Sequence, residues 1–278
     1  MTETVVAQAA PDANAAPVME KRCRYGNMLF LRHDQYIGRS LALYGEFSEF
    51  EGQLFGQLLS PGDVVVEVGA NIGAHTVHLA QLVGPGGVVH AFEPQRVIFQ
   101  ILCANMALNG LFNVHTHQVG LGSAVTSMFV PPVNYAHGGN FGGLSLSASG
   151  MGEKVPIHTL DELALPSLKL IKIDVEGMER EALDGARRTI NERRPFIYVE
   201  NDRKEKSAAL LTLLDTLGYA MYWHLPPLFN VNNFAGNAEN IFPDIVSINL
   251  FCVPREASVT VNGFRSVSGP DDWWQNAI

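Results

Sequence analysis

"VVVEVGANIGAHT", residues 64–76, is the stretch of sequence that decides the fold. It begins as a run of apolar residues, passes through a turn that starts at Gly69, and continues as a helix-like pattern. Such an apolar run is typical of a strand that is buried on both faces, as in a parallel sheet. The turn differs from a dinucleotide fingerprint, because Asn71 stands where the second glycine would be.

Strand-like and helix-like segments alternate along the rest of the chain. Alternation at short intervals favours a sheet of parallel strands with helices on both faces. We therefore expect an α/β fold with a doubly wound, mostly parallel, seven-stranded sheet. The strands are predicted at 64–68, 88–93, 112–119, 168–174, 195–201, 219–224 and 244–253.

Segments of different character surround this pattern. We expect a disordered tail over 1–20, a helical cap over 21–60, the α/β domain over 61–256 and a surface tail over 257–278. The alternation is interrupted over 122–168, which contains a stretch rich in Gly, Ser and Pro. A loop of that length inside a compact domain is usually functional or disordered.

The composition excludes several classes of protein. A net charge of −9 argues against general binding to nucleic acid or to anionic membranes, which needs a surplus of Lys and Arg. The three cysteines are far apart, so neither a zinc site nor a disulfide framework is expected, and a reduced, cytoplasmic setting fits best. We expect no signal peptide, because the first 19 residues lack a basic start and a continuous apolar segment, and no apolar run is long enough to span a membrane. The oligomeric state stays open, with a homodimer as one alternative.

The turn suits a ligand that has a nucleoside, a carboxylate and an amine but no pyrophosphate. In doubly wound sheets the ligand lies beyond the carboxyl ends of the strands, and Asn71 brings a polar side chain into the space that a pyrophosphate would need. S-adenosylmethionine is such a ligand, and Glu67 would face its cationic side. Glu93, twenty residues after Gly73, can accept two hydrogen bonds from a ribose diol. The alternative is that Glu93 only caps the following helix.

Downstream motifs resemble one known family. "HTLDEL" (158–163) and "LIKIDVEGMEREALDGA" (170–186) resemble the signature of the FkbM methyltransferases, which are class I, Rossmann-like enzymes. "FNVNNFAGNAENIF" (229–242) and "SINLFCVPRE" (247–256) resemble that family's carboxyl-terminal pattern. The resemblance implies methyl transfer from S-adenosylmethionine, usually to a hydroxyl oxygen of a sugar, polyketide or other secondary metabolite. It also implies that Glu67, Gly69, Asn71 and Gly73 bind the methionine part, Glu93 the ribose, and Gln118, Val119 and Gly120 the adenine, while Asp174 faces the methyl donor. Ala70 and Pro94 are further candidate cofactor-binding residues.

Candidate catalytic residues follow the fourth and fifth strands. Methyl transfer requires an aligned acceptor and removal of its proton, and Asp174, Glu176 and Glu200 are carboxylates that could serve as the base. Together with Asn201, Asp174 and Glu200 also resemble the magnesium site of catechol-type O-methyltransferases. Two departures are that Glu200 stands in place of Asp and that Gly177 stands in place of a lysine. The alternative is that Glu200 and Asn201 orient substrate hydroxyls without a metal ion.

Acceptor recognition is expected from two segments outside the sheet, 131–150 and 224–237. Their mixture of aromatic and amide side chains suits a polyhydroxylated or ring-bearing acceptor, although such residues can also simply close the fold. The first segment is a candidate lid that excludes water. The candidate substrate-binding residues are Tyr135, Asn140, Phe141, His224, Phe229 and Asn233.

The sequence therefore predicts an S-adenosylmethionine-dependent O-methyltransferase that acts on a small molecule, with magnesium as an open question. N-methylation is the alternative within the same chemistry, and it needs less assistance from a base. A nicotinamide oxidoreductase is disfavoured by Asn71. A non-catalytic binding protein of the same fold is disfavoured because the turn, Glu93 and Asp174 are all present.

Overall fold

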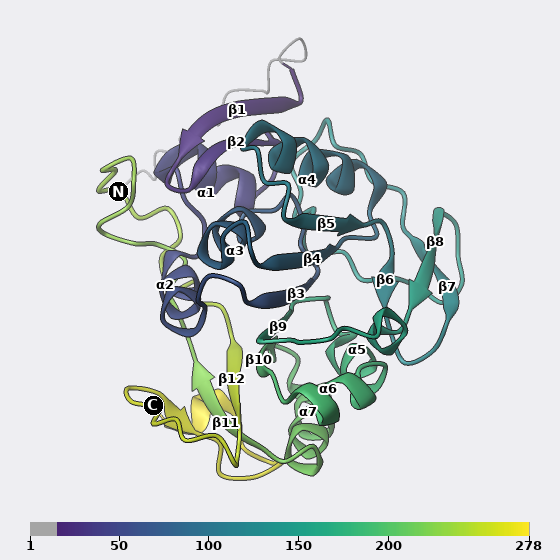
Figure 1. Cartoon of the computed structure of the whole chain (residues 1–278). Helices are drawn as coiled ribbons and strands as arrows, with labels where there is room; N and C mark the ends of the chain where they lie inside the picture. The colour runs from purple at the N-terminus through teal and green to yellow at the C-terminus, as the bar shows by residue number, and fades with distance from the viewer. Residues whose placement is uncertain (1–15, 278) are drawn as a thin grey trace, which may run out of the picture.

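An eight-stranded sheet forms the centre of the protein, as seen in a computed structural model that describes residues 16–277 (Figure 1). Five neighbouring strands are parallel, and β12 is antiparallel to the strands on either side of it. The predicted α/β class with a mostly parallel sheet is confirmed. The predicted number of strands is wrong, because the short β13 adds to the edge of the sheet. In order across the sheet the strands are β13 (Arg265–Ser266), β11 (Tyr219–His224), β12 (Asn249–Pro254), β10 (Phe196–Glu200), β9 (Leu170–Ile173), β3 (Val64–Val68), β4 (Val88–Phe92) and β5 (Val114–His117).

Helices cover both faces of this sheet, because each central strand buries alternate side chains on opposite sides. Val65 and Val89 pack against α2 and α3, whereas Val66 and Phe92 belong to the core beneath α5, α6 and α7. Among residues 16–277, no helix has both the length and the apolar character that a membrane crossing requires. The helices are α1 (Ile37–Tyr44), α2 (Glu49–Leu58), α3 (Thr76–Val83), α4 (Arg96–Leu108), α5 (Glu179–Asp184), α6 (Arg187–Arg193) and α7 (Lys204–Thr216), with short 3₁₀ turns at Leu160–Leu163 and Trp274–Ala277.

The N-terminal segment contains a β-hairpin that the sequence did not predict. Strands β1 (Val18–Cys23) and β2 (Gly26–Leu31) pair antiparallel, and α1 and α2 follow them. Asn105 on α4 holds the hairpin by donating to the carbonyl of Leu29 (2.9 Å) and accepting from its N–H (2.7 Å). A disordered tail was predicted for residues 1–20. Residues 1–15 of it lie outside the described residues. The prediction is wrong for Val18 to Glu20, because these residues belong to β1.

The segment 122–168 is also more regular than its composition suggested. It contributes β7 (Thr126–Val130) and β8 (Glu153–His158), which form a small sheet with β6 (Gly120–Leu121) beside the main sheet (Figure 1). The C-terminal residues differ from the expected surface tail, because Trp273 is buried and its ring lies 5.9 Å from that of Trp223 on β11. This contact and the pairing of β13 attach the end of the chain to the sheet edge.

Candidate functional site

The main cavity has a volume of about 290 Å³ and lies where the sequence predicted a ligand site. It opens beyond the carboxyl ends of β3, β4, β9 and β10. Each of these ends brings one carboxylate to the wall, from Glu67, Glu93, Asp174 and Glu200 respectively. The parallel strands therefore bring together side chains that are more than a hundred residues apart in the sequence.

The turn after β3 forms the floor of this cavity. Gly69 has a φ of +82°, and a Cβ atom there would lie 1.8 Å from the carbonyl oxygen of Asp174, so that only glycine permits this approach. Ala70 and Asn71 also line the cavity, and Asn71 adopts the left-handed conformation with a φ of +50°. Gly73 does not line it. A side chain at Gly73 would collide with α4, so this glycine serves packing rather than close approach of a ligand.

Glu93 lines the site and is fixed there by the backbone. Its two carboxylate oxygens accept hydrogen bonds from the N–H groups of Asn71 (3.0 Å) and Gln95 (2.8 Å). Burial raises the pKa of Glu93 to about 7, although these two hydrogen bonds act in the opposite direction. Because each carboxylate oxygen can accept more than one hydrogen bond, Glu93 retains acceptor capacity for a ligand.

A buried lysine, which the sequence reasoning missed, lies beneath the carboxylates. Lys172 on β9 is 2% exposed, and its Nζ lies 3.4 Å from Asp174 Oδ2 and 3.9 Å from Glu67 Oε1. Thr76 donates a hydrogen bond of 2.6 Å to the other oxygen of Glu67. The available signal was a lysine within the apolar strand "LIKI", because a buried charge requires partners.

The charges in this group change one another's proton affinity. Burial raises the pKa of Glu67 to about 7, with Lys172 opposing the rise. Burial on its own would lower the pKa of Lys172, but Asp174, Glu67 and Glu51 together hold it above its ordinary value. Lys172 therefore remains an ammonium group at the base of the cavity.

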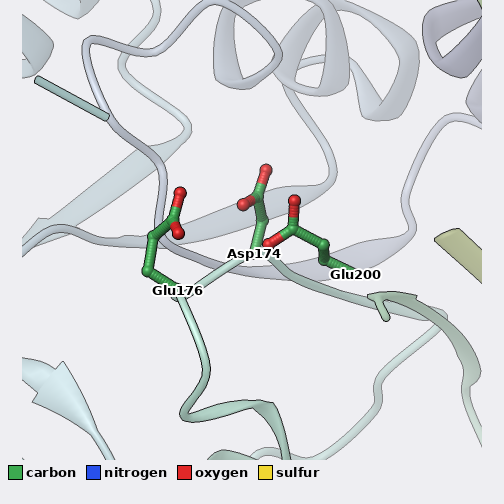
Figure 2. Close-up of side chains that lie close together, drawn as sticks. All are labelled: Asp174, Glu176 and Glu200. Carbon is green, nitrogen blue, oxygen red and sulfur yellow. The ribbon is translucent and has the colours of Figure 1, made fainter. Parts of the chain in front are cut away.

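Three carboxylates converge at the side of the cavity formed by β9 and β10. Asp174, Glu176 and Glu200 point toward one another (Figure 2), and each has a carboxylate oxygen within 4.8 Å of the others. Burial raises the pKa of Glu176 to about 7 and that of Glu200 well above its usual range, and the charge of Asp174 adds to both. Within the described residues, Oε2 of Glu200 is buried and has no hydrogen-bond partner. This group can therefore take up a proton.

Asn201 does not join these carboxylates. Its side-chain amide is buried and donates a hydrogen bond of 2.9 Å to the hydroxyl of Ser207. Asn201 lines a separate cavity and not the main one, whereas Glu176 lies with Asp174 and Glu200. The structure therefore gives no support to the predicted magnesium ligand set of Asp174, Glu200 and Asn201.

A second, narrower cavity adjoins the first, and Gly69, Glu93 and Asp174 line both. Its walls are mainly apolar. Val119 and Gly120, which were predicted to flank an adenine, line this cavity, and so does Pro94, whereas Gln118 does not. The other apolar residues in the walls are Val68, Phe92, Leu121, Leu144, Leu146, Val175 and Met178.

The sequence model of the family described as "Methyltransferase FkbM domain" matches residues 67–221. The chain belongs to the FkbM methyltransferase family. It is therefore a methyltransferase, as the sequence predicted. The matched region contains the turn, Glu93, Lys172 and the three converging carboxylates.

The alignments of the methyltransferase with three relatives cover different shares of its chain. Methyltransferase 1 of Beauveria bassiana (strain ARSEF 2860) is 31% identical over 180 residues, which cover 56% of this chain and 72% of that protein. The 31-O-demethyl-FK506 methyltransferase FkbM of Streptomyces tacrolimicus is 57% identical over 47 residues, which cover 17% of this chain and 18% of that protein. A solved FkbM methyltransferase from Methylobacillus flagellatus KT is 19% identical with a TM-score of 0.47, covering 79% of this chain and 55% of that one. The chain thus spans just over half of the solved relative and under a fifth of the Streptomyces protein.

The part of the methyltransferase's main cavity that comes from the N-terminal segment and from the connection between β11 and β12 is largely apolar, and its residues were not predicted. Tyr36, Ile37 and Phe47 come from the N-terminal segment, and Leu228 and residues 245–248 come from the connection between β11 and β12. No local motif marks these positions, because they are ordinary apolar residues until the fold places them opposite the turn. This apolar side is the candidate acceptor wall.

Of the six predicted substrate-binding residues, only Asn140 lines the main cavity. The other five have contacts that hold the fold together. Phe141 is buried with its ring 5.1 Å from that of Tyr135, and His224 Nδ1 lies 2.9 Å from the hydroxyl of Tyr198. Phe229 packs against Tyr44, and the amide of Asn233 donates to the carbonyl of Asn230 at 2.9 Å.

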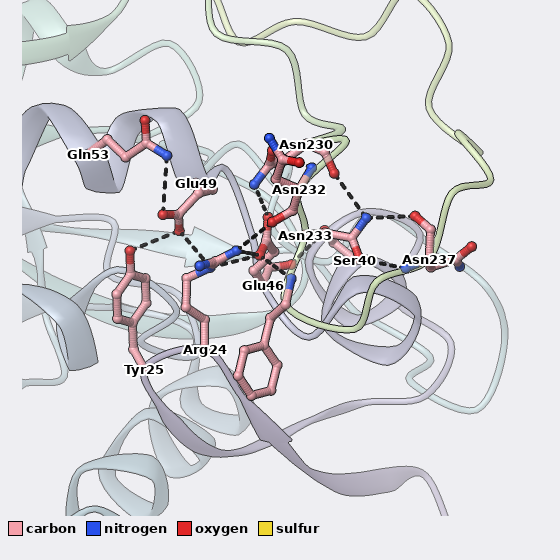
Figure 3. Close-up of polar contacts among 11 residues, drawn as sticks. Arg24, Tyr25, Ser40, Glu46, Glu49, Gln53, Asn230, Asn232, Asn233 and Asn237 are labelled. Carbon is pink, nitrogen blue, oxygen red and sulfur yellow. Dashed lines mark hydrogen bonds and ion pairs between the residues drawn. The ribbon is translucent and has the colours of Figure 1, made fainter.

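A polar cluster fastens the two halves of the acceptor wall to each other (Figure 3). Glu46 is buried and accepts hydrogen bonds from Arg24 Nε (2.8 Å) and from the side-chain amide of Asn230 (2.9 Å). Glu46 precedes Phe47, and Asn230 lies two residues after Leu228. The cluster therefore fixes the position of the acceptor wall without lining the cavity itself.

Proposed function

We propose that the methyltransferase takes its methyl group from S-adenosylmethionine bound across the two cavities. Three features fit this donor. Gly69 leaves the floor of the main cavity free of a side chain. Glu93 presents a fixed carboxylate to both cavities. The second cavity, here called the slot, is lined by Val119 and other apolar residues and suits an adenine ring. The donor supplies a methyl group that is already activated by a sulfonium centre.

We further propose that the acceptor group is a hydroxyl, and the convergence of Asp174, Glu176 and Glu200 carries this proposal. A neutral hydroxyl is a weak nucleophile and would become a strongly acidic oxonium, so it must lose its proton as it attacks the methyl carbon, whereas a neutral amine is nucleophilic enough to attack without a base. The side chain of Asp174 is 46% exposed and lies between Lys172 and the other two carboxylates. A carboxylate oxygen of Asp174 therefore receives the proton, and the raised pKa values of Glu176 and Glu200 let the group hold it.

The acceptor we propose is a small molecule such as a sugar, a polyketide or another secondary metabolite. The main cavity offers an apolar wall on one side and hydrogen-bonding carboxylates on the other, which suits a ring-bearing molecule with hydroxyl groups. The name of the Streptomyces relative, a 31-O-demethyl-FK506 methyltransferase, is consistent with transfer to oxygen. The predicted magnesium set of Asp174, Glu200 and Asn201 is not part of the proposal, because Asn201 does not line the main cavity. The oxidoreductase alternative loses its support with membership of a methyltransferase family.

An experiment with a deuterated methyl donor tests whether the acceptor group is a hydroxyl. The enzyme is incubated with S-adenosylmethionine that carries a deuterated methyl group and with a panel in which each alcohol is matched by the amine of the same skeleton. Mass spectrometry then finds the labelled product, and NMR locates the label. We expect the label on oxygen, and a label on nitrogen would overturn the hydroxyl assignment.

Two variants separate the base from the binding site. Asp174→Asn is expected to bind S-adenosylhomocysteine and to lose turnover, whereas Asp271→Asn, at an exposed aspartate, is expected to behave as the wild type. Wild-type turnover by Asp174→Asn would remove Asp174 from the proton transfer.

A further inference from the structure

One short segment of the chain passes over both cavities. Residues 141–147, here called the strap, are anchored at both ends. At the first end, Phe141 is buried in the core and its carbonyl accepts a hydrogen bond of 3.0 Å from the side chain of Gln95. At the other end, the backbone of Ser147 pairs with that of Phe129 on β7 through hydrogen bonds of 2.8 and 3.0 Å. Between these anchors, Gly142 lines both cavities.

Alternate residues of the strap face in opposite directions. Leu144 and Leu146 are half-buried and line the second cavity, whereas Ser145 between them is exposed. Leu146 closes one end of the second cavity, because its Cδ1 would lie 3.4 Å from a Cβ atom placed on Gly120, which is van der Waals contact. The two leucines therefore contribute apolar lining to the second cavity, together with Val119 and Gly120.

A polar contact on the outer side holds the middle of the strap. The hydroxyl of Ser145 donates to the carbonyl of Glu176 (3.0 Å), and Arg203 Nη2 lies 3.4 Å from the same hydroxyl. Arg203 also bonds to the carboxylate of Glu176 at 2.7 Å. Ser145 is exposed, and contacts of this kind at the surface are weak individually. The middle of the strap is thus held more weakly than its ends.

We propose that the strap is the outer wall of the adenine site, with Leu144 and Leu146 covering the adenine ring, and that its middle must move outward for the donor to be exchanged. This inference rests on the proposed use of S-adenosylmethionine. It adds cofactor-binding residues from the connection between β7 and β8 of the small sheet rather than from the strand ends of the main sheet. The apolar lining of the slot, the alternation of the strap and its weak central contact all agree with it.

Calorimetric titration of the whole protein with two ligands tests the assignment. S-adenosylhomocysteine contains the adenine, whereas S-ribosylhomocysteine has the same ribose and homocysteine without it. In the double variant Leu144→Ala/Leu146→Ala, we expect the dissociation constant for S-adenosylhomocysteine to rise about tenfold or more, because two half-buried leucines lose their contact with the ring. The affinity for S-ribosylhomocysteine should stay unchanged.

Two control variants guard against a general effect on folding. Val125→Ala changes an exposed residue of the segment 122–168 and should leave both affinities unchanged. Leu144→Met/Leu146→Met keeps an apolar cover and should bind S-adenosylhomocysteine nearly as well as the wild type. Thermal unfolding without ligand establishes that each variant is folded.

The outcomes distinguish the inference from the proposal beneath it. If the wild type does not bind S-adenosylhomocysteine, the proposed donor is wrong. If the wild type binds it and the double alanine variant binds equally well, the strap does not cover the adenine. An equal loss for both ligands would also overturn the inference, because it would show a structural role. For the central contact, Ser145→Ala should release S-adenosylhomocysteine several-fold faster, and an unchanged dissociation rate would refute the outward movement.

Discussion

Replacing Lys172 with methionine should destabilise the folded enzyme, and more so as the pH rises. Methionine has a similar length and fills the same space, but it removes the ammonium group that lies 3.9 Å from Glu67 Oε1 and 3.4 Å from Asp174 Oδ2. Glu67 is 1% exposed and depends on this charge, whereas Asp174 is about half-exposed and keeps its contact with water. Most of the effect should therefore pass through Glu67.

The magnitude follows from the proton affinity of Glu67. In the folded wild type its pKa rises from 4.5 to about 7, which corresponds to about 3 kcal/mol at about 1.4 kcal/mol per pKa unit. Because the folded-state pKa is raised, Glu67 favours folding fully below its unfolded value and loses that contribution as the pH rises through about 7. Without Lys172, the pKa of Glu67 rises further and the loss continues above pH 7. We expect Lys172→Met to cost about 1 kcal/mol at low pH and about 3–5 kcal/mol at high pH.

Urea unfolding at about pH 5, 7 and 8.5 measures this difference. Lys154→Met is the matched control, because Lys154 is an exposed lysine on β8 outside both cavities. A Lys172→Met protein as stable as Lys154→Met at the highest pH would refute the buried ion pair. A loss that is the same at all three pH values would show that Glu67 is not the group that titrates.

Further predictions concern the donor site and the acceptor wall. Glu93→Gln should weaken binding of S-adenosylhomocysteine about 10- to 100-fold in calorimetry, because a charged acceptor of hydrogen bonds is lost; an unchanged affinity would exclude the ribose role. The affinity of the wild type for S-adenosylhomocysteine should increase between about pH 6 and 8, since the pKa of Glu93 is about 7 and the ribose requires its ionised form. Binding should therefore release a proton from Glu93. Calorimetric titrations in two buffers of different ionisation enthalpy that show no proton release would contradict this. Gly69→Ala should lower the melting temperature far more than the control Gly62→Ala. Gly62 also has a positive φ, of +96°, but no atom lies within 4 Å of the methyl group that alanine would add there. Equal losses for the two variants would mean that the close approach of Gly69 to Asp174 does not matter. Glu46→Ala should lower the free energy of unfolding in urea by about 2–4 kcal/mol, because Glu46 accepts hydrogen bonds from Arg24 and Asn230. It should also raise the KM for the acceptor and leave the affinity for S-adenosylhomocysteine unchanged. A change in the affinity for S-adenosylhomocysteine alone would show that the polar cluster supports the donor site and not the acceptor wall.

Local signals in the sequence were sufficient for the sheet and for the donor turn. The apolar run at 64–68 coincides with β3, and each of the other predicted strand ranges contains part of an observed strand. Gly69 and Glu93 each come at or directly after the end of a predicted strand, so that their place in the donor site can be predicted from neighbouring residues in the sequence. The seven predicted strands did not include β13, because two residues that pair only at the edge leave no periodic pattern.

The acceptor wall was decided by tertiary structure. Tyr36 and Phe47 face the cavity only because the N-terminal hairpin and helices dock against α4 and the segment after β11. The amides of that segment resembled substrate contacts in the sequence, but Asn233 closes a loop instead. A side chain that can bond either to a ligand or to its own backbone does not reveal its partner until the packing is known.

The sequence by itself determined that a parallel sheet carries a turn suited to a nucleoside ligand and acids at its strand ends, because each of these features depends on neighbours within a few residues. Only the tertiary structure decided which charges meet. Lys172 lies opposite Glu67 through the parallel register of β9 and β3, and Asp174, Glu176 and Glu200 converge from β10 and the loop after β9. Electrostatic interactions depend on distance and burial, and both are set by strands that are far apart in the chain.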